Sequence, residues 1–195
     1  TGTSASGCTG TTTIMVTVNS NATITASASP ASICSGEYST ISASGGSTYV
    51  WSPSGSGASF VASPATTTTY SVTGTTASGC SGTTTVTLTV NALPNITATA
   101  SPAAVCVGFS TTISGGGGTS YVWDNGQNTA SFSEIPTATT TYNVTGTDAN
   151  NCSNTATVTV TLMSGLTVNI TPAVENICEG ESTTLTASSP GSGVV

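Results

Sequence analysis

Residues Thr83–Val90 read T-T-T-V-T-L-T-V, an alternation that places Val86, Leu88 and Val90 on one side and threonines on the other. A period of two is the signature of a β-strand with one buried face. Two further stretches repeat the pattern, so the same half-buried strand is expected three times. Their apolar positions are Ile14, Val16 and Val18 in the first stretch, and Val158, Val160 and Leu162 in the last.

This recurrence belongs to a repeat of 72 residues. Cys8, Cys80 and Cys152 are 72 residues apart, and Cys34, Cys106 and Cys178 follow the same step. Trp51 and Trp123 also obey it. A fixed period of this kind indicates an array of similar units. We therefore expect four segments: residues 1–19 as the end of one repeat, 20–91 and 92–163 as two Ig-like repeats, and 164–195 as the start of a further one.

Short strands separated by Gly, Ser and Pro clusters fill each repeat. Besides the alternating stretch, the candidates in the first full repeat are 22–27, 39–44, 48–51, 58–62 and 68–73. The 195 residues include 44 Thr and 31 Ser, and such an abundance of β-branched threonine favours strands over helices. A Trp on the third strand and a Tyr at the start of the penultimate strand are typical of immunoglobulin-like sandwiches. The predicted fold is all-β, with tandem immunoglobulin-like β-sandwich domains in an extended rod.

The charge balance excludes several classes of function. The chain has seven acidic residues and no Lys, Arg or His, which gives a formal net charge of -7. Binding to nucleic acid or to anionic lipid relies on cationic side chains, so neither partner is expected. No side chain of the usual kind can act as a general base near neutral pH, and the many hydroxyl groups lack an activating base. We expect no enzymatic activity, no cofactor and no segment inserted in a membrane.

Four stretches of the first repeat resemble a known repeat type. They are ASPASICSG at 28–36, STYVWSP at 47–53, SPATTTTYSVTGT at 63–75 and SGCSGTTTVTLTV at 78–90. Together they resemble the tandem Ig-like, PKD-related repeats of very large cell-surface adhesins of gliding, Bacteroidetes-type bacteria. The resemblance implies an extracellular location, export by type IX secretion and a role in adhesion or gliding motility. Residues 124–126 (Asp-Asn-Gly) depart from it towards the acidic turn of PKD repeats.

The six cysteines predict disulfides, because no CxxC pair or His suggests a metal site. Two pairings remain open. Pairing within a repeat would join Cys34 to Cys80 and Cys106 to Cys152. In a seven-strand sandwich those positions lie at opposite ends, which slightly favours an interdomain bond between Cys34 and Cys152. The other cysteines would then have partners outside this chain.

Two further groups of side chains have an alternative interpretation. Trp51, Trp123, Tyr49 and Tyr121 could form a platform for glycans, although their placement along alternating strands favours the core. Asp148 with Asn150 and Asn151, or Glu179 with Glu181, could contribute to a Ca²⁺ site, but so few acids do not make a multidentate cage. We expect no metal.

These features predict a structural shaft segment of a large extracellular repeat adhesin or surface filament. Its partners would be neighbouring repeats of the same chain and other filament or anchor proteins. The alternatives are a glycan-binding Ig-like module and a spacer array in a secreted enzyme. Saturable glycan binding by one repeat would indicate the first, and a catalytic domain rich in His, Asp and Glu the second.

Overall fold

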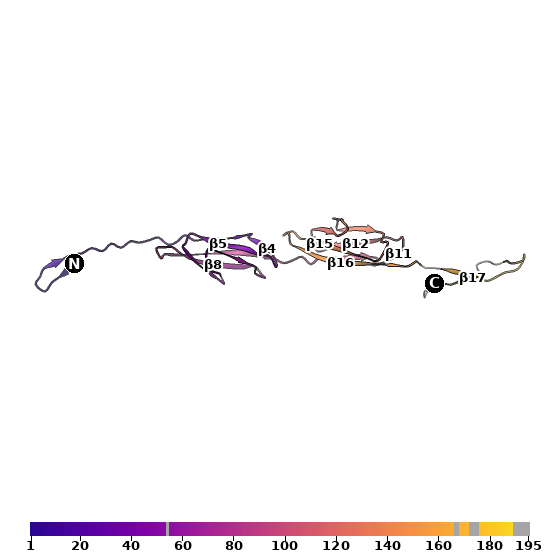
Figure 1. The fold of residues 1–195 in the computed structure, drawn as a ribbon, viewed down its shortest axis with the longest axis horizontal. Coiled ribbons are helices and arrows are strands. Elements are labelled where there is room, and N and C mark those ends of the chain that lie inside the picture. Colours follow the sequence, from indigo (N-terminus) through magenta and orange to yellow (C-terminus); the bar gives the residue numbers. More distant parts are fainter. Residues whose placement is uncertain (54, 166–167, 172–175, 189–195) are drawn as a thin grey trace. The chain divides into compact units, whose positions relative to one another are not determined.

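The computed structural model describes residues 1–53, 55–165, 168–171 and 176–188. The chain divides into two units, Thr1–Ala92 and Leu93–Val195. The described residues form strands, turns and extended segments without a helix, and so offer no helical segment that could cross a bilayer. Figure 1 shows β4, β5 and β8 in the first unit and β11, β12, β15 and β16 in the second.

Each unit contains a three-stranded and a four-stranded sheet. In the first unit the strand orders are β3-β5-β7 and β4-β9-β8-β6, and in the second they are β10-β12-β14 and β11-β16-β15-β13. The strands of the first unit are β3 (Thr25–Ser29), β4 (Ser32–Cys34), β5 (Ser39–Ser44), β6 (Thr48–Ser52), β7 (Ser59–Ala62), β8 (Thr68–Thr75) and β9 (Ser81–Asn91). Those of the second are β10 (Thr97–Ser101), β11 (Ala104–Cys106), β12 (Thr111–Gly116), β13 (Ser120–Trp123), β14 (Ser131–Glu134), β15 (Thr140–Thr147) and β16 (Ser153–Met163).

The strand order identifies an immunoglobulin-like sandwich. Within each sheet all neighbours are antiparallel except the short strand β4, which runs parallel to β9, and its counterpart β11, which runs parallel to β16. One sheet of each unit holds the first, third and fifth strands, and the other holds the last two strands between the second and the fourth, which matches the Ig arrangement. The predicted all-β, Ig-like sandwich fold is confirmed.

Each sandwich has its own apolar core. In the first unit Ile41, Val72 and Leu88 are fully buried, and Ile113, Val144 and Val160 are their counterparts in the second. Phe60 stacks edge-on against both Trp51 and Tyr70, with ring centroids 5.3 and 5.5 Å apart. Leu88 comes from the alternating stretch that predicted β9, with Val86 and Val90 packed beside it.

The chain enters and leaves a unit at opposite ends. Gly74 and Gly82 lie on either side of the β8–β9 hairpin, and their hydrogens face Ile24 and Ala22 at the start of the unit. A Cβ on Gly74 would meet Ile24 Cδ1 at 2.4 Å, so glycine is needed for this close approach. The chain then leaves after Asn91, at the far end of β9. Eleven strand residues separate the two ends by about 36 Å.

The described residues outside the two sandwiches form two short hairpins. β1 (Gly2–Thr3) pairs with β2 (Thr9–Gly10), and β17 (Asn169–Thr171) pairs with β18 (Thr186–Ser188). The strand expected around Ile14, Val16 and Val18 is absent, and these side chains are 77–89% exposed. The prediction was wrong because a half-buried strand needs neighbours, and this chain lacks counterparts of the strands that flank β9.

The predicted division into four segments is finer than the two units. The cores fit the repeats, since the first extends from Ile24 to Leu88 and the second from Ile96 to Val160. The boundaries at 19/20, 91/92 and 163/164 stay predictions, and part of the last predicted segment lies outside the described residues.

Candidate functional site: the cysteine-bearing ends of each sandwich

The aromatic residues proposed as a glycan platform lie in the cores. Trp51 is 4% exposed and Trp123 2% exposed. Their indole nitrogens donate to the carbonyls of Gly57 and Thr129 at 3.1 and 3.0 Å, which satisfies the buried polar atom. The interpretation as core residues is therefore confirmed for both tryptophans.

The tyrosines beside them close a turn. Tyr49 Oη lies 2.8 Å from both the amide nitrogen and the carbonyl oxygen of Gly46, accepting from one and donating to the other. Tyr121 makes the same pair of contacts with Gly118, at 3.0 and 2.8 Å. Both phenols thus have a local structural role.

The acidic residues considered for Ca²⁺ are engaged in turns. Asp148 Oδ1 accepts from the amides of Asn150 and Cys152 at 2.8 and 2.9 Å, which stabilises the β15–β16 hairpin. Asn151 takes a positive φ of 62° in that hairpin, a conformation that Asn tolerates. Glu181 Oε2 lies 3.5 Å from the amide of Cys178. In the described part of the chain, no three His, Cys, Asp or Glu side chains group as metal ligands would.

One titrating group outside the turns is perturbed. Burial raises the pKa of the Tyr142 phenol above its usual value, and the negative charges of Glu134 and Asp124 raise it further. All three causes disfavour the phenolate. The phenol is therefore held in its neutral form in the core.

One cysteine of each repeat lies in the last hairpin. Cys80 directly precedes β9 and Cys152 directly precedes β16. The hairpins close with matching backbone bonds, Thr76 N to Cys80 O and Asp148 N to Cys152 O, both 2.9 Å. This is the end where the chain enters the unit, and Cys80 Sγ lies 3.8 Å from the carbonyl oxygen of Asn19 on the incoming segment.

The other cysteine lies where the chain leaves the unit. Cys34 ends β4 and is the register partner of Asn91, the last residue of β9. Cys106 is likewise the register partner of Met163 at the end of β16. In each case a tight turn with glycine follows, and Gly36 and Gly108 have φ values of 93° and 86°. That left-handed conformation favours glycine at the turn.

The register excludes the pairing within a repeat. Cys34 lies level with the last residue of β9, whereas Cys80 precedes its first residue, so about 33 Å separates them. A disulfide requires Cα atoms within about 7 Å. Cys106 and Cys152 have the same relation along β16.

The cysteines also differ in their chemical state. Cys8, Cys80, Cys106 and Cys178 are free thiols. Each of the two intradomain pairs therefore contains one free thiol, Cys80 in the first and Cys106 in the second. Cys34 and Cys152 take part in disulfide bonding. Cys152 is fully buried, whereas its counterparts Cys80 and Cys8 are partly and fully exposed.

The end at which the chain leaves the first unit differs chemically from the equivalent end of the second unit. In the first unit Asn91 Nδ2 donates to Ser32 Oγ at 2.8 Å, and the Cys34 amide donates to Glu37 Oε2 at 2.9 Å. In the second unit the residues 72 positions later are Met163, Ala104 and Phe109. Polar groups that bond to one another are thus replaced by apolar ones.

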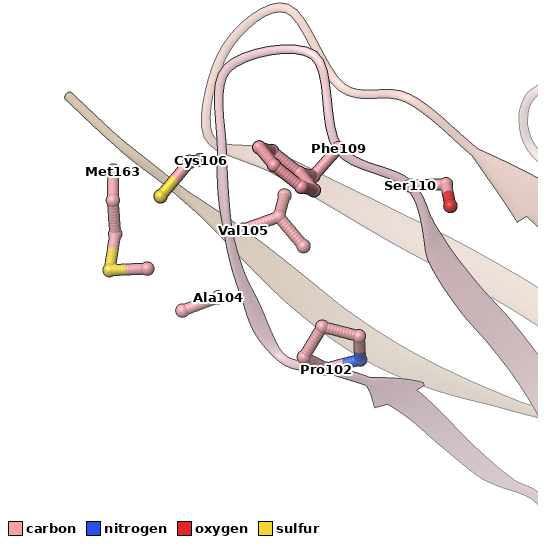
Figure 2. A pocket seen from close by; sticks show the side chains of 7 residues that line it. All are labelled: Pro102, Ala104, Val105, Cys106, Phe109, Ser110 and Met163. Carbon is pink, nitrogen blue, oxygen red and sulfur yellow. The ribbon is translucent and has the colours of Figure 1, made fainter. Parts of the chain in front are cut away.

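These replacements create an open pocket of about 250 Å³ in the second unit. Figure 2 shows the Phe109 ring beside Val105, with the Cys106 thiol and the Met163 thioether towards the same side. Phe109 is 67% exposed and Met163 44% exposed. Sequence reasoning missed this pocket. The sequence did contain a signal for the pocket: of three equivalent repeat positions, two are glutamates, Glu37 and Glu181, and the third is Phe109.

No family model matches the chain, and no curated protein matches it. Solved structures with a similar fold include a 1.5-MDa bacterial ice-binding adhesin (16% identity, 78% of this chain and 69% of that chain, TM-score 0.40). A Ca²⁺-stabilised adhesin of an Antarctic bacterium is 19% identical over 77% of this chain and 52% of its own length, with a TM-score of 0.41. The amphioxus IgVJ-C2 molecule is 18% identical over 67% and 99%, with a TM-score of 0.32. This chain thus spans about half of the Antarctic adhesin chain, and at these values the likenesses carry no argument about function.

Proposed function

We propose that this chain is a segment of the structural shaft of a large extracellular repeat adhesin or surface filament. The observation that carries the proposal is that the chain enters and leaves each sandwich at opposite ends of an eleven-residue strand. Repeats with separate cores and opposite ends add length as they are added along a chain. The product of such an array is reach and mechanical continuity between an anchor and a distal tip.

The chemistry of the surface favours this role over catalysis or binding. The two tryptophans considered for glycan stacking are buried, and Asp148, considered for Ca²⁺, is used in a turn. We therefore propose that the segment is not an enzyme and that its partners are neighbouring repeats, together with filament or anchor proteins. Disulfide bonding favours an oxidising, extracellular location. Gliding motility and type IX export rest on the resemblance of the repeats alone.

Mechanical continuity also depends on the junction between units, where we place a disulfide staple between Cys34 and Cys152. Cys34 is level with Asn91, and Asn154, close to Cys152, donates to the carbonyl of Pro94 at 3.1 Å. Only two residues lie between positions 91 and 94, so the chain itself keeps their Cα atoms within about 11 Å. The first unit supports the same arrangement, because Cys80 lies beside Asn19, the counterpart of Asn91.

The shaft proposal is tested by the length of the molecule in solution. Residues 92–163 would be duplicated in tandem within the full chain, and small-angle X-ray scattering would give the maximum dimension of both proteins. A shaft gains about 36 Å or more for the added repeat, the length of β16. A gain of only a few ångströms, as expected when an added domain packs into one globule, would overturn the proposal.

The staple is tested by mapping disulfides in the full chain after digestion without reductant. We expect a peptide containing Cys34 to be linked to one containing Cys152. Cys34→Ser should remove that link and loosen the junction, whereas the control Cys80→Ser should leave both unchanged. A map that links Cys34 to Cys80 would contradict the staple and leave the shaft proposal standing.

A further inference from the structure

The apolar pocket around Cys106 calls for an explanation that the first unit does not need. Near Cys34, its counterpart, the neighbouring side chains are polar: Asn91 Nδ2 donates to Ser32 Oγ, and Glu37 Oε2 accepts from the Cys34 amide. At the end of the second unit these side chains are replaced by Met163, Ala104 and Phe109, while the cysteine is retained. Exposed apolar side chains gathered around a retained thiol indicate a surface that is covered by a partner.

We propose that this pocket is the docking site for the cysteine-bearing last hairpin of a following Ig-like repeat, and that Cys106 forms a disulfide with that hairpin. The inference rests on the proposed shaft function. It extends that function by assigning a chemically distinct junction to the end of the second unit.

The occupant follows from the geometry inside the first unit. There the hairpin cysteine, Cys80, lies 3.8 Å from the carbonyl of Asn19. Asn19, Asn91 and Met163 occupy the same position in successive repeats. A repeat that follows Met163 in the same way therefore brings its hairpin cysteine to Met163, whose register partner is Cys106.

The open, apolar pocket suits a hairpin made of small residues. The hairpins of this chain contain small residues, with Ala77, Ser78 and Gly79 before Cys80. A thin turn of this kind can lie against Phe109 without displacing the buried Val105. Contact with the ring removes apolar surface from water, which raises the effective concentration of one thiol at the other.

Bond formation is a two-electron oxidation. The two thiols lose two protons and two electrons as the S–S bond forms, and a small-molecule disulfide accepts them and leaves as two thiols. Oxidised glutathione supplies this reagent in the test. The measured quantity is the equilibrium constant for the bond in a glutathione buffer.

The experiment completes a third repeat on the existing chain. Residues 1–188 would be joined to a second copy of residues 117–163, because Ser188 is equivalent to Gly116 in the repeat. The added segment supplies a copy of the Asp148–Cys152 hairpin. The change Ala149→Ser in the added copy alone gives its hairpin peptide a distinct mass. Peptide mapping should then show Cys106 linked to the added hairpin cysteine and not to Cys152, and Cys106→Ser should abolish that link alone.

A matched variant tests the docking itself. Phe109→Glu with Met163→Asn installs the residues that the first unit carries at these positions. With Trp51 and the added copy of Trp123 replaced by Phe, fluorescence of Trp123 reports that the second unit stays folded. We expect the equilibrium constant for the Cys106 disulfide to fall about tenfold, because an exposed ring and thioether no longer gain burial. An unchanged constant would overturn the docking site, and a Cys106 that stays a free thiol would overturn the whole proposal.

These outcomes are separate from the test of the shaft. The maximum dimension of the extended chain depends on where each sandwich is entered and left, which neither variant alters. A long molecule with a free Cys106 would retain the shaft and reject this junction. A compact molecule would reject the shaft whatever the state of Cys106.

Discussion

Single side chains in these sandwiches fix turns as well as fill the cores. The Tyr49 phenol bonds to both backbone groups of Gly46, three residues earlier, and Tyr121 repeats this contact with Gly118. The turn therefore depends on one hydroxyl rather than on the sequence of the turn alone. A hydroxyl that both donates and accepts is the requirement, and Phe cannot meet it.

Removal of the Tyr49 hydroxyl should weaken the first unit measurably. Tyr49→Phe leaves both groups of a half-buried Gly46 without their partner, which costs about 1 kcal/mol of unfolding free energy. Denaturant unfolding can be followed by Trp51 fluorescence in a Trp123→Phe background. The control Tyr38→Phe, at a phenol that is 73% exposed, should change the free energy little. Equal effects of the two substitutions would contradict the role of the turn.

The perturbed phenol of Tyr142 predicts a pH dependence for the second unit. Its pKa is raised in the folded state by burial, Glu134 and Asp124, whereas the unfolded chain has the ordinary value of about 10. The unfolded state thus loses its proton first as the pH rises. The stability due to this group is fully present below about pH 10 and is lost as the pH passes through the folded pKa.

Tyr142→Phe should make the second unit less sensitive to alkali. We expect the unfolding midpoint, followed by Trp123 fluorescence in a Trp51→Phe background, to fall less between pH 9 and 11 in the variant than in the parent. The exposed control Tyr38→Phe should not change the slope. Parallel pH profiles for parent and Tyr142→Phe would show that the phenol does not contribute.

At the scale of elements, alternation alone predicted strands well where neighbouring strands exist. The stretch 39–44 was predicted with the bounds of β5, and 83–90 lies within β9. β4 was not among the predicted strands, because three residues with a single buried Ile33 give no periodic signal. The segment around Val16 failed for the opposite reason, since its pattern is strong but its partner strands are missing.

The candidate site was predictable only in part. Repeat spacing identified the cysteines, and the Ig topology gave their opposite ends. The pocket at Cys106 could not be predicted, because it is lined by both Met163 and Phe109 beside a parallel strand pair that the pattern does not reveal.

Limited proteolysis should cut the two equivalent alternating stretches, residues 11–18 and 83–90, at different rates. Thermolysin cuts beside large apolar residues in accessible, extended chain, and Ile14 and Val16 are 88% and 77% exposed. Leu88, in the same pattern, is fully buried in β9. The first cuts should therefore fall within residues 11–20, as judged by mass spectrometry. After heat denaturation both stretches should be cut at similar rates, and early cuts within native β9 would contradict the fold.

At the scale of the whole molecule, separate cores imply separate unfolding. The first core lies between Ile24 and Leu88 and the second between Ile96 and Val160, with no residue common to both. Each core contains one tryptophan, so each unit carries its own fluorescent reporter. A shaft built in this way can lose one unit under load while its neighbour stays folded.

Leu88→Ala tests this independence directly. Loss of a fully buried leucine should lower the unfolding free energy of the first unit by about 3 kcal/mol. Under reducing conditions, the transition seen by Trp51 should move to lower denaturant while that seen by Trp123 stays in place, each measured with the other tryptophan replaced by Phe. Thr89→Ala, at the exposed next position of β9, is the matched control and should move neither transition by more than a small amount. Equal shifts at both tryptophans would mean that the two sandwiches unfold as one body, and a shaft whose units fail one at a time would then be ruled out.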